Sequence, residues 1–293
     1  MSIIQISLAF TRYLYQMIEV KQSLFIALLD HNPEEALFWT YELYYSGFEE
    51  EVYNYILMVY NTIYKKRNPS LQANFDAKHK KWQDGLSDGT DIGSIVYTLA
   101  LRPYYLVDFT RKYLYANIAS SDATNTTNNA THFIVNVTPE YIAKYATHDP
   151  HSASDIHRRR VLEDFGKYSI CKDYHRLFNT MTHADFADAF TRKWLYYASF
   201  SPIWEKRIAI HNGLIDYDDE TVTFANEDDE EAFRSTWDYE PDEASQSVFT
   251  RHCGTGNETM FSVKDFCERY NYTITSRIVK RKPKTANPTQ TDT

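Results

Sequence analysis

Glycine is scarce in this chain, with only 8 among 293 residues. A low glycine content disfavours a turn-rich all-β fold and the glycine-rich loops that hold phosphate groups, and it suits helices. Cysteine is rarer still, and the odd number and the spacing of Cys171, Cys253 and Cys267 fit no zinc motif. The three thiols are therefore predicted to be reduced, which indicates a reducing compartment.

Long apolar runs and an excess of cations are also missing. Arg12, Glu19 and Lys21 interrupt the apolar N-terminal stretch, so no run reaches the roughly 18 residues of a membrane span. The same stretch does not follow the pattern of a signal peptide, and no membrane association is expected. Lys and Arg number 31 against 40 Asp and Glu, a net charge of −9. This balance argues against nucleic acid as the main partner, because phosphates must be covered by cations.

Tyrosine, in contrast, is abundant, with 24 residues. Between Leu37 and Phe48 the aromatic residues fall on more than one face of a predicted helix, a pattern typical of an inner helix packed between neighbours. The alternative is a tyrosine-rich edge that binds a partner, since tyrosine keeps a polar tip at a surface. The candidate residues for such protein interaction are Trp39, Tyr41, Tyr44 and Tyr45.

Helical spacing and capping residues predict a succession of helices. Apolar residues recur at helical intervals over 20–29 and 52–63, and residues 91–118 are expected to form a helix broken at Pro103. Asn32 and Asn68 each precede a proline, so each is predicted to cap a new helix. The spacing between these two starts is compatible with the period of a helical repeat.

The predicted fold is therefore all-α, with irregular stacked helical pairs resembling a helical repeat, and with a short strand as an option at 221–224. A single irregular helical domain is the alternative. The predicted organisation comprises an N-terminal helical domain (1–120), a polar loop (121–137), a second helical region (138–213), an acidic loop with a C-terminal helix (214–278), and a disordered tail (279–293).

Four blocks of sequence suggest a family. An "EALFWTYELYYSGFE" block covers Glu35–Glu49, "RPY" covers Arg102–Tyr104, a tryptophan- and proline-containing block covers Trp194–Arg207, and "EPDE" covers Glu240–Glu243. In this order they resemble a group of uncharacterised proteins encoded by nucleocytoplasmic large DNA viruses, the giant viruses. The resemblance implies a viral protein that works in the host cytoplasm, at the viral factory, or is packaged in the virion. It carries over no catalytic residue.

Two groups of residues invite a catalytic interpretation. His148, His151 and His157 lie close together with two aspartates, and such residues can ligate zinc or iron. The alternative, which the sequence favours, is a solvated polar loop. His252 and Cys253 are adjacent, but a Cys–His nucleophile requires a base within hydrogen-bonding reach, which sequence neighbours seldom provide. No catalytic, metal-ligating or cofactor-binding residue is therefore assigned.

Basic residues near aromatic ones can hold single-stranded nucleic acid. The candidates for this role are Lys78, Lys80, Lys81, Trp82, Arg158, Arg159 and Arg160. The alternative is a solvated helix face that pairs with the acidic segment 216–231, itself expected to be a solvated loop.

The sequence thus predicts a non-catalytic viral interaction or scaffold protein whose partners are other viral or host proteins. A nucleic-acid-associated factor in viral gene expression is the first alternative, and a metal-dependent enzyme is the second.

Overall fold

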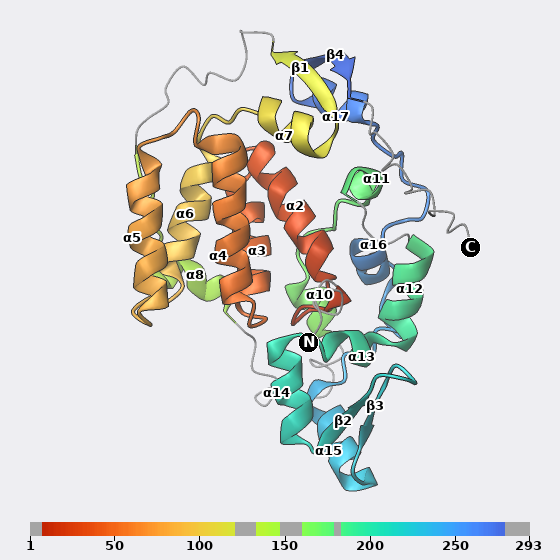
Figure 1. Cartoon of the computed structure of the whole chain (residues 1–293). Coiled ribbons are helices and arrows are strands. Elements are labelled where there is room, and N and C mark those ends of the chain that lie inside the picture. Colours follow the sequence, from red (N-terminus) through yellow and green to blue (C-terminus); the bar gives the residue numbers. More distant parts are fainter. Residues whose placement is uncertain (1–7, 121–132, 147–159, 179–182, 279–293) are drawn as a thin grey trace, which may run out of the picture.

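The computed structural model describes residues 8–120, 133–146, 160–178 and 183–278. Within them the chain is mostly helical and contains two small antiparallel sheets of two strands each. Figure 1 shows the N-terminal helices side by side in one part of the molecule, with the C-terminal helices and both sheets arranged around the other part.

The N-terminal helices follow the predicted order. They are α2 (Met17–Leu29), α3 (Pro33–Tyr44), α4 (Glu49–Val59), the π-helix η1 (Tyr60–Tyr64) that continues α4, α5 (Leu71–Gln83) and α6 (Thr90–Ala100). Helix α3 packs against α2, α4 and α6, and α5 packs against α6. The inner-helix interpretation of residues 37–48 is therefore confirmed for α3, which has neighbours on several sides.

The caps decide where these helices begin and end. Asn32 caps α3 as predicted, because its side chain accepts a hydrogen bond from Glu35 N and Pro33 follows. Gly47 follows α3 with φ +88°, and a Cβ there would lie 2.6 Å from Pro202 Cβ, so both conformation and space require glycine.

The predicted cap at Asn68 is wrong. Helix α5 begins at Leu71, and the Asn68 side chain instead donates hydrogen bonds to the carbonyl oxygens of Tyr64 and Pro103, at 3.0 and 2.8 Å. Asn68 thus ties the end of η1 to the chain that follows α6. Only the first of the two Asn-Pro sequences caps a helix, so the predicted helical repeat is not supported. The described helices show no repeating unit.

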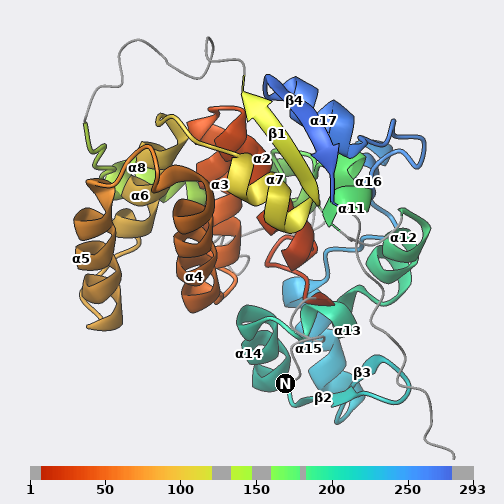
Figure 2. The same cartoon turned by 45° about the horizontal axis from the view of Figure 1, so that its top comes forward.

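The expected helix over 91–118 is correct only in part. The helix breaks at Pro103 as predicted, and a second helix, α7 (Val107–Tyr113), follows. The chain then leaves the helical conformation at Tyr115, which has φ +53°, and residues Ala116–Ser120 form strand β1. Strand β1 pairs antiparallel with β4 (Tyr272–Arg277), at the far end of the described chain. Figure 2 shows this sheet beside α7 and α17 (Val263–Arg269). The all-α prediction missed it because the pairing partners are distant in sequence.

The remaining elements are short. They are α8 (Pro139–Ile142), η2 (Ala143–Tyr145), α10 (Val161–Phe165), η4 (Lys172–Tyr174), α11 (His175–Phe178), α12 (His183–Arg192), α13 (Trp194–Ala198), α14 (Pro202–Ile210), β2 (Gly213–Asp216), β3 (Thr221–Phe224), α15 (Glu227–Trp237) and α16 (Gln246–Cys253). In the described part of the chain, no helix combines the length and apolar character needed to cross a bilayer.

The predicted strand at 221–224 is confirmed as β3, which pairs antiparallel with β2. The predicted acidic loop is wrong, since its second half begins helix α15. The Asn226 side chain caps α15 by accepting a hydrogen bond from Asp229 N at 2.9 Å. Four acidic residues occupy the first turn of α15, where the positive end of the helix dipole stabilises them.

The segment 9–16 lies in the core and contacts both the N-terminal helices and the region 197–204. Phe10 N donates to Tyr197 O at 3.0 Å, and Trp204 Nε1 donates to Thr11 O at 3.1 Å. A buried ion pair, Arg12 Nε to Glu42 Oε2 at 3.0 Å, attaches the same segment to α3.

Candidate functional site

The tryptophan and tyrosines of α3 divide by burial. Trp39 and Tyr41 are fully buried: Trp39 Nε1 donates to Glu35 Oε1 at 3.2 Å, and Tyr41 Oη donates to Gly89 O at 3.0 Å. Neither side chain can contact a partner while the fold is intact. Tyr44 and Tyr45 remain partly exposed at the end of α3, and the Arg12 guanidinium carbon lies 5.0 Å from the Tyr45 ring centre.

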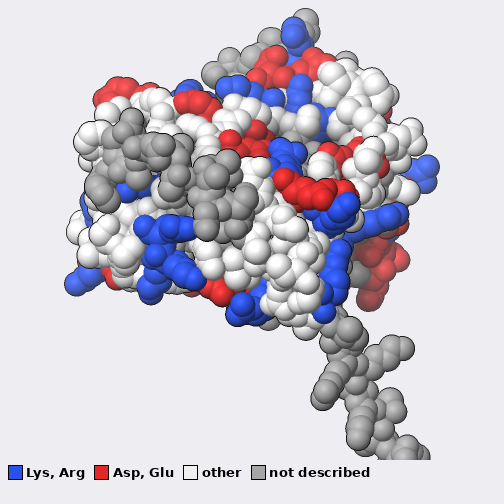
Figure 3. All heavy atoms as spheres, turned by 90° about the horizontal axis from the view of Figure 1, so that it is seen from above, with Lys and Arg blue, Asp and Glu red and all other residues white. Residues whose placement is uncertain are grey.

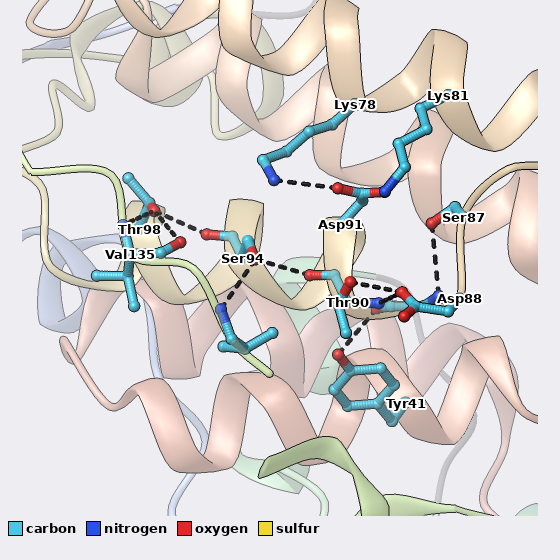
Figure 4. A network of polar contacts seen from close by, with 12 residues as sticks. Tyr41, Lys78, Lys81, Ser87, Asp88, Thr90, Asp91, Ser94, Thr98 and Val135 are labelled. Atoms are coloured by element: carbon cyan, nitrogen blue, oxygen red, sulfur yellow. Dashed lines mark hydrogen bonds and ion pairs between the residues drawn. The ribbon is translucent and has the colours of Figure 1, made fainter. Parts of the chain in front are cut away.

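The lysines of α5 serve the fold. Figure 4 shows Lys78 and Lys81 both pointing to the buried carboxylate of Asp91, in the first turn of α6, at 3.1 and 2.8 Å. Burial acts to raise the pKa of Asp91, but the hydrogen bonds from Lys81 and Lys78 outweigh it and hold that pKa below its usual value. Trp82 stacks on Tyr53 with ring centres 4.8 Å apart. Lys80, the fourth residue of this helix predicted to bind nucleic acid, is exposed and forms no ion pair with a described carboxylate.

The second predicted basic cluster is only partly described. Arg160 lies beside Glu163 and Asp164 at 3.5 and 3.7 Å, next to α10, whereas Arg158 and Arg159 lie outside the described residues. Figure 3 looks down on the molecule from above the view of Figure 1. Over much of this face the cationic and anionic side chains are interspersed, rather than arranged as one continuous basic stripe.

The residues considered for catalysis do not form a described site. His148, His151 and His157 lie outside the described residues, and no metal-binding group of three or more His, Cys, Asp or Glu occurs within them. His252 has Nδ1 2.9 Å from Val248 O and Nε2 2.9 Å from Tyr13 O. Both nitrogens thus contact backbone oxygens, and burial raises the pKa of the adjacent Cys253 thiol to about 12. Such a pair does not make an activated nucleophile.

A groove that the sequence did not predict lies between α2, α4, α7 and α11. Its volume is about 350 Å³. Phe25, Phe109 and Phe178 form an aromatic floor, in which the ring centres of Phe25 and Phe109 are 4.8 Å apart and those of Phe25 and Phe178 are 6.0 Å apart. Helix α7 packs against η1 and contributes Phe109, Lys112 and Tyr113 to the lining, and Figure 1 shows α7 near one end of α2.

The rim of the groove consists of large side chains that the fold leaves uncovered. Met58, Tyr113 and Tyr115 are 40%, 39% and 37% exposed, and all three line the groove. Apart from the tyrosines, the polar residues among those that the structure places in the lining of the groove are Thr62 and Lys112. An apolar hollow without convergent polar groups is poorly suited to catalysis, but it suits an apolar side chain of a partner.

Part of this site could have been read from the sequence. Met58 lies off the apolar stripe of α4, which predicts exposure of a flexible apolar side chain. No sequence pattern, however, places Met58 next to Tyr113 and Phe178, because these residues meet only through packing.

Comparison with known proteins adds no assignment: no protein-family model, no curated protein and no solved structure matches this chain. What the structure defines is a mostly helical protein with two small sheets and an aromatic groove.

Proposed function

We propose that this chain is a non-catalytic interaction protein, and that the groove holds a segment of its partner. The observation that carries the proposal is the exposure of Met58, Tyr113 and Tyr115 beside an aromatic floor in which Phe25 and Phe109 are buried and Phe178 is partly buried. Aromatic side chains and methionine are enriched at the centres of protein interfaces, where they lose their water on binding.

The resemblance to giant-virus proteins supports a viral origin for the chain. The proposed partners are accordingly other viral or host proteins, met in the host cytoplasm at the viral factory or in the virion. The nucleic-acid alternative has less support, because Lys78 and Lys81 share one carboxylate instead of facing solvent as a free pair. The metal-enzyme alternative rests on histidines outside the described residues.

The test is comparative affinity purification from infected cells. Met58→Ser removes an apolar rim side chain, and Ile210→Ser is the matched control because Ile210 is 74% exposed at the end of α14. We expect a partner, identified by mass spectrometry after nuclease treatment, to be recovered with the parent and with Ile210→Ser, and to be depleted at least about tenfold with Met58→Ser.

Two results would contradict the proposal. One is equal recovery of every partner by the parent and by Met58→Ser. The other is a set of partners that disappears from all samples after nuclease treatment, since that set would be held through nucleic acid.

A further inference from the structure

The charges around the groove indicate the chemistry of its partner. Most described cations elsewhere on this acidic chain have an acidic neighbour: Lys21 is paired with Glu51, Lys193 with Glu220, and Arg269 with Asp30. Five exposed cations near the groove do not form an ion pair with any described carboxylate. They are Lys65, Lys66, Arg67, Arg111 and Lys112.

These five cations lie on two segments that border the groove. Lys65, Lys66 and Arg67 directly follow η1, which supplies Thr62 to the groove lining, and Lys112 is itself part of the lining. Helix α7, which carries Arg111 and Lys112, packs against η1. Each group of cations therefore lies at the C-terminus of a helix, η1 in one case and α7 in the other. The negative end of each helix dipole stabilises these positive charges.

Uncharged neighbours contact each of these cations without neutralising it. Lys66 Nζ lies 3.8 Å from the centre of the Tyr105 ring, and Arg111 Nε donates to Asn117 Oδ1 at 3.3 Å. Asp108, the one acidic residue in α7, precedes Arg111 and Lys112 by three and four residues and so lies on the same side of the helix, but it forms no ion pair with either of them. Asp108 therefore offsets part of the positive charge of α7, whereas no described carboxylate forms an ion pair with Lys65, Lys66 or Arg67.

We propose that the groove binds an acidic peptide segment: an aromatic or aliphatic side chain enters above Phe25 and Phe109, and flanking Asp or Glu residues contact Lys112 and the cations after η1. This inference rests on the proposed function and adds the class of partner. Opposite charges at the edge of an apolar patch set orientation and partner choice.

A nucleic-acid strand fits these observations less well. The five cations lie on two short segments, 65–67 and 111–112, instead of following a long track, and the net charge of −9 repels a polyphosphate. The groove is also a hollow of about 350 Å³ and does not offer the flat surface on which bases stack.

The experiment is selection of short random peptides by phage display on the full chain. The strongest binder is then synthesised with a fluorescent label and its affinity is measured by anisotropy. We expect selected peptides to combine one or two large apolar residues with several Asp or Glu. Their affinity should fall as salt rises from about 50 to 200 mM, because exposed charge contacts are screened.

Variants separate the two parts of the contact. Binding of the peptide should be about tenfold weaker in Lys112→Glu, since the substitution replaces an attraction between opposite charges by a repulsion. Met58→Ser should weaken it by a similar factor. The matched controls are Lys80→Glu, an exposed lysine on α5 outside the groove lining, and Ile210→Ser, and both should bind like the parent.

The outcomes distinguish this inference from the proposed function. Peptides without acidic residues that are lost in Met58→Ser would overturn the acidic partner and leave the groove as a protein-binding site. Selection of no peptide, or of peptides insensitive to Met58→Ser, would overturn the inference, and the infected-cell experiment would still decide the proposed function. A labelled oligothymidine that binds and is lost in Lys112→Glu, with no peptide bound, would assign the cations to nucleic acid.

Discussion

His252 is enclosed in the core, between the rings of Tyr15 and Phe190 at centre distances of 4.1 and 5.0 Å. Its two nitrogens face two carbonyl oxygens, yet neutral imidazole has only one N–H to donate. Burial lowers the pKa of His252 from 6.5 to about 4, because the imidazolium is costly to enclose, and the two backbone contacts offset this only in part.

This shift predicts a pH dependence of stability. Between pH 6.5 and about pH 4 the unfolded chain takes up a proton at this residue and the folded chain does not. The free energy of unfolding should therefore fall as pH is lowered through this window, by up to about 3 kcal/mol from His252 alone. We expect His252→Gln to remove this contribution, as measured by urea unfolding across the window.

Glu19 acts in the opposite direction, so a comparison of variants is essential. Burial raises its pKa to about 7 despite its ion pair with Lys172, and stability from Glu19 is lost as pH rises from 4.5 to that value. The difference between the parent and His252→Gln cancels this effect. A difference that stays constant with pH would refute the prediction, and His211→Gln, at a partly exposed histidine, serves as control.

At the scale of elements, α3 and α6 approach each other through Gly93. A Cβ at Gly93 would lie 2.0 Å from Tyr41 Oη, the same hydroxyl that donates to Gly89 O. Glycine inside a helix normally costs up to about 1 kcal/mol relative to alanine, so its presence here reflects space and not helix propensity. The polar contacts in Figure 4 extend along this side of α6, where Ser94 Oγ and Thr98 Oγ1 accept hydrogen bonds from the backbone of residues 137 and 135.

We therefore expect Gly93→Ala to destabilise the protein by about 1–3 kcal/mol, the usual cost of overpacking. Tyr41→Phe removes the hydroxyl that the new methyl group would meet. The double variant should be more stable than the sum of the two single effects predicts, in a cycle of urea-unfolding measurements. Simple additivity would show that the two residues do not share this contact.

At the scale of the whole molecule, contacts between distant segments favour unfolding as one unit. Segment 9–16 bonds to Tyr197 and Trp204, and β1 pairs with β4. The predicted division into ranges 1–120, 138–213 and 214–278 stays a prediction, but these contacts join the first range to each of the other two.

Tyr272→Ala tests this cooperativity. Tyr272 is a buried residue of β4, and truncation of a large buried aromatic side chain costs about 3–5 kcal/mol. We expect the whole unfolding transition to shift, with tryptophan fluorescence and far-UV circular dichroism remaining coincident. Two separated transitions would instead indicate independently stable parts.

Local sequence determined the helices whose signals lie within a few residues. The Asn32 cap and the apolar spacing of α2 and α4 depend on neighbours along the chain, and each formed as predicted. The predicted cap failed at Asn68, whose side chain instead contacts Pro103. The predicted acidic loop failed because the Asn226 side chain caps helix α15.

Tertiary structure alone decided the rest, because packing determines which apolar and charged side chains lose their water. Trp39 and Met58 are both large and apolar, yet one is buried against Tyr15 and the other is left at a groove. Likewise Lys78 lies beside a carboxylate and Lys112 does not. Contacts between residues far apart in sequence form only when the chain folds, and local spacing does not specify them.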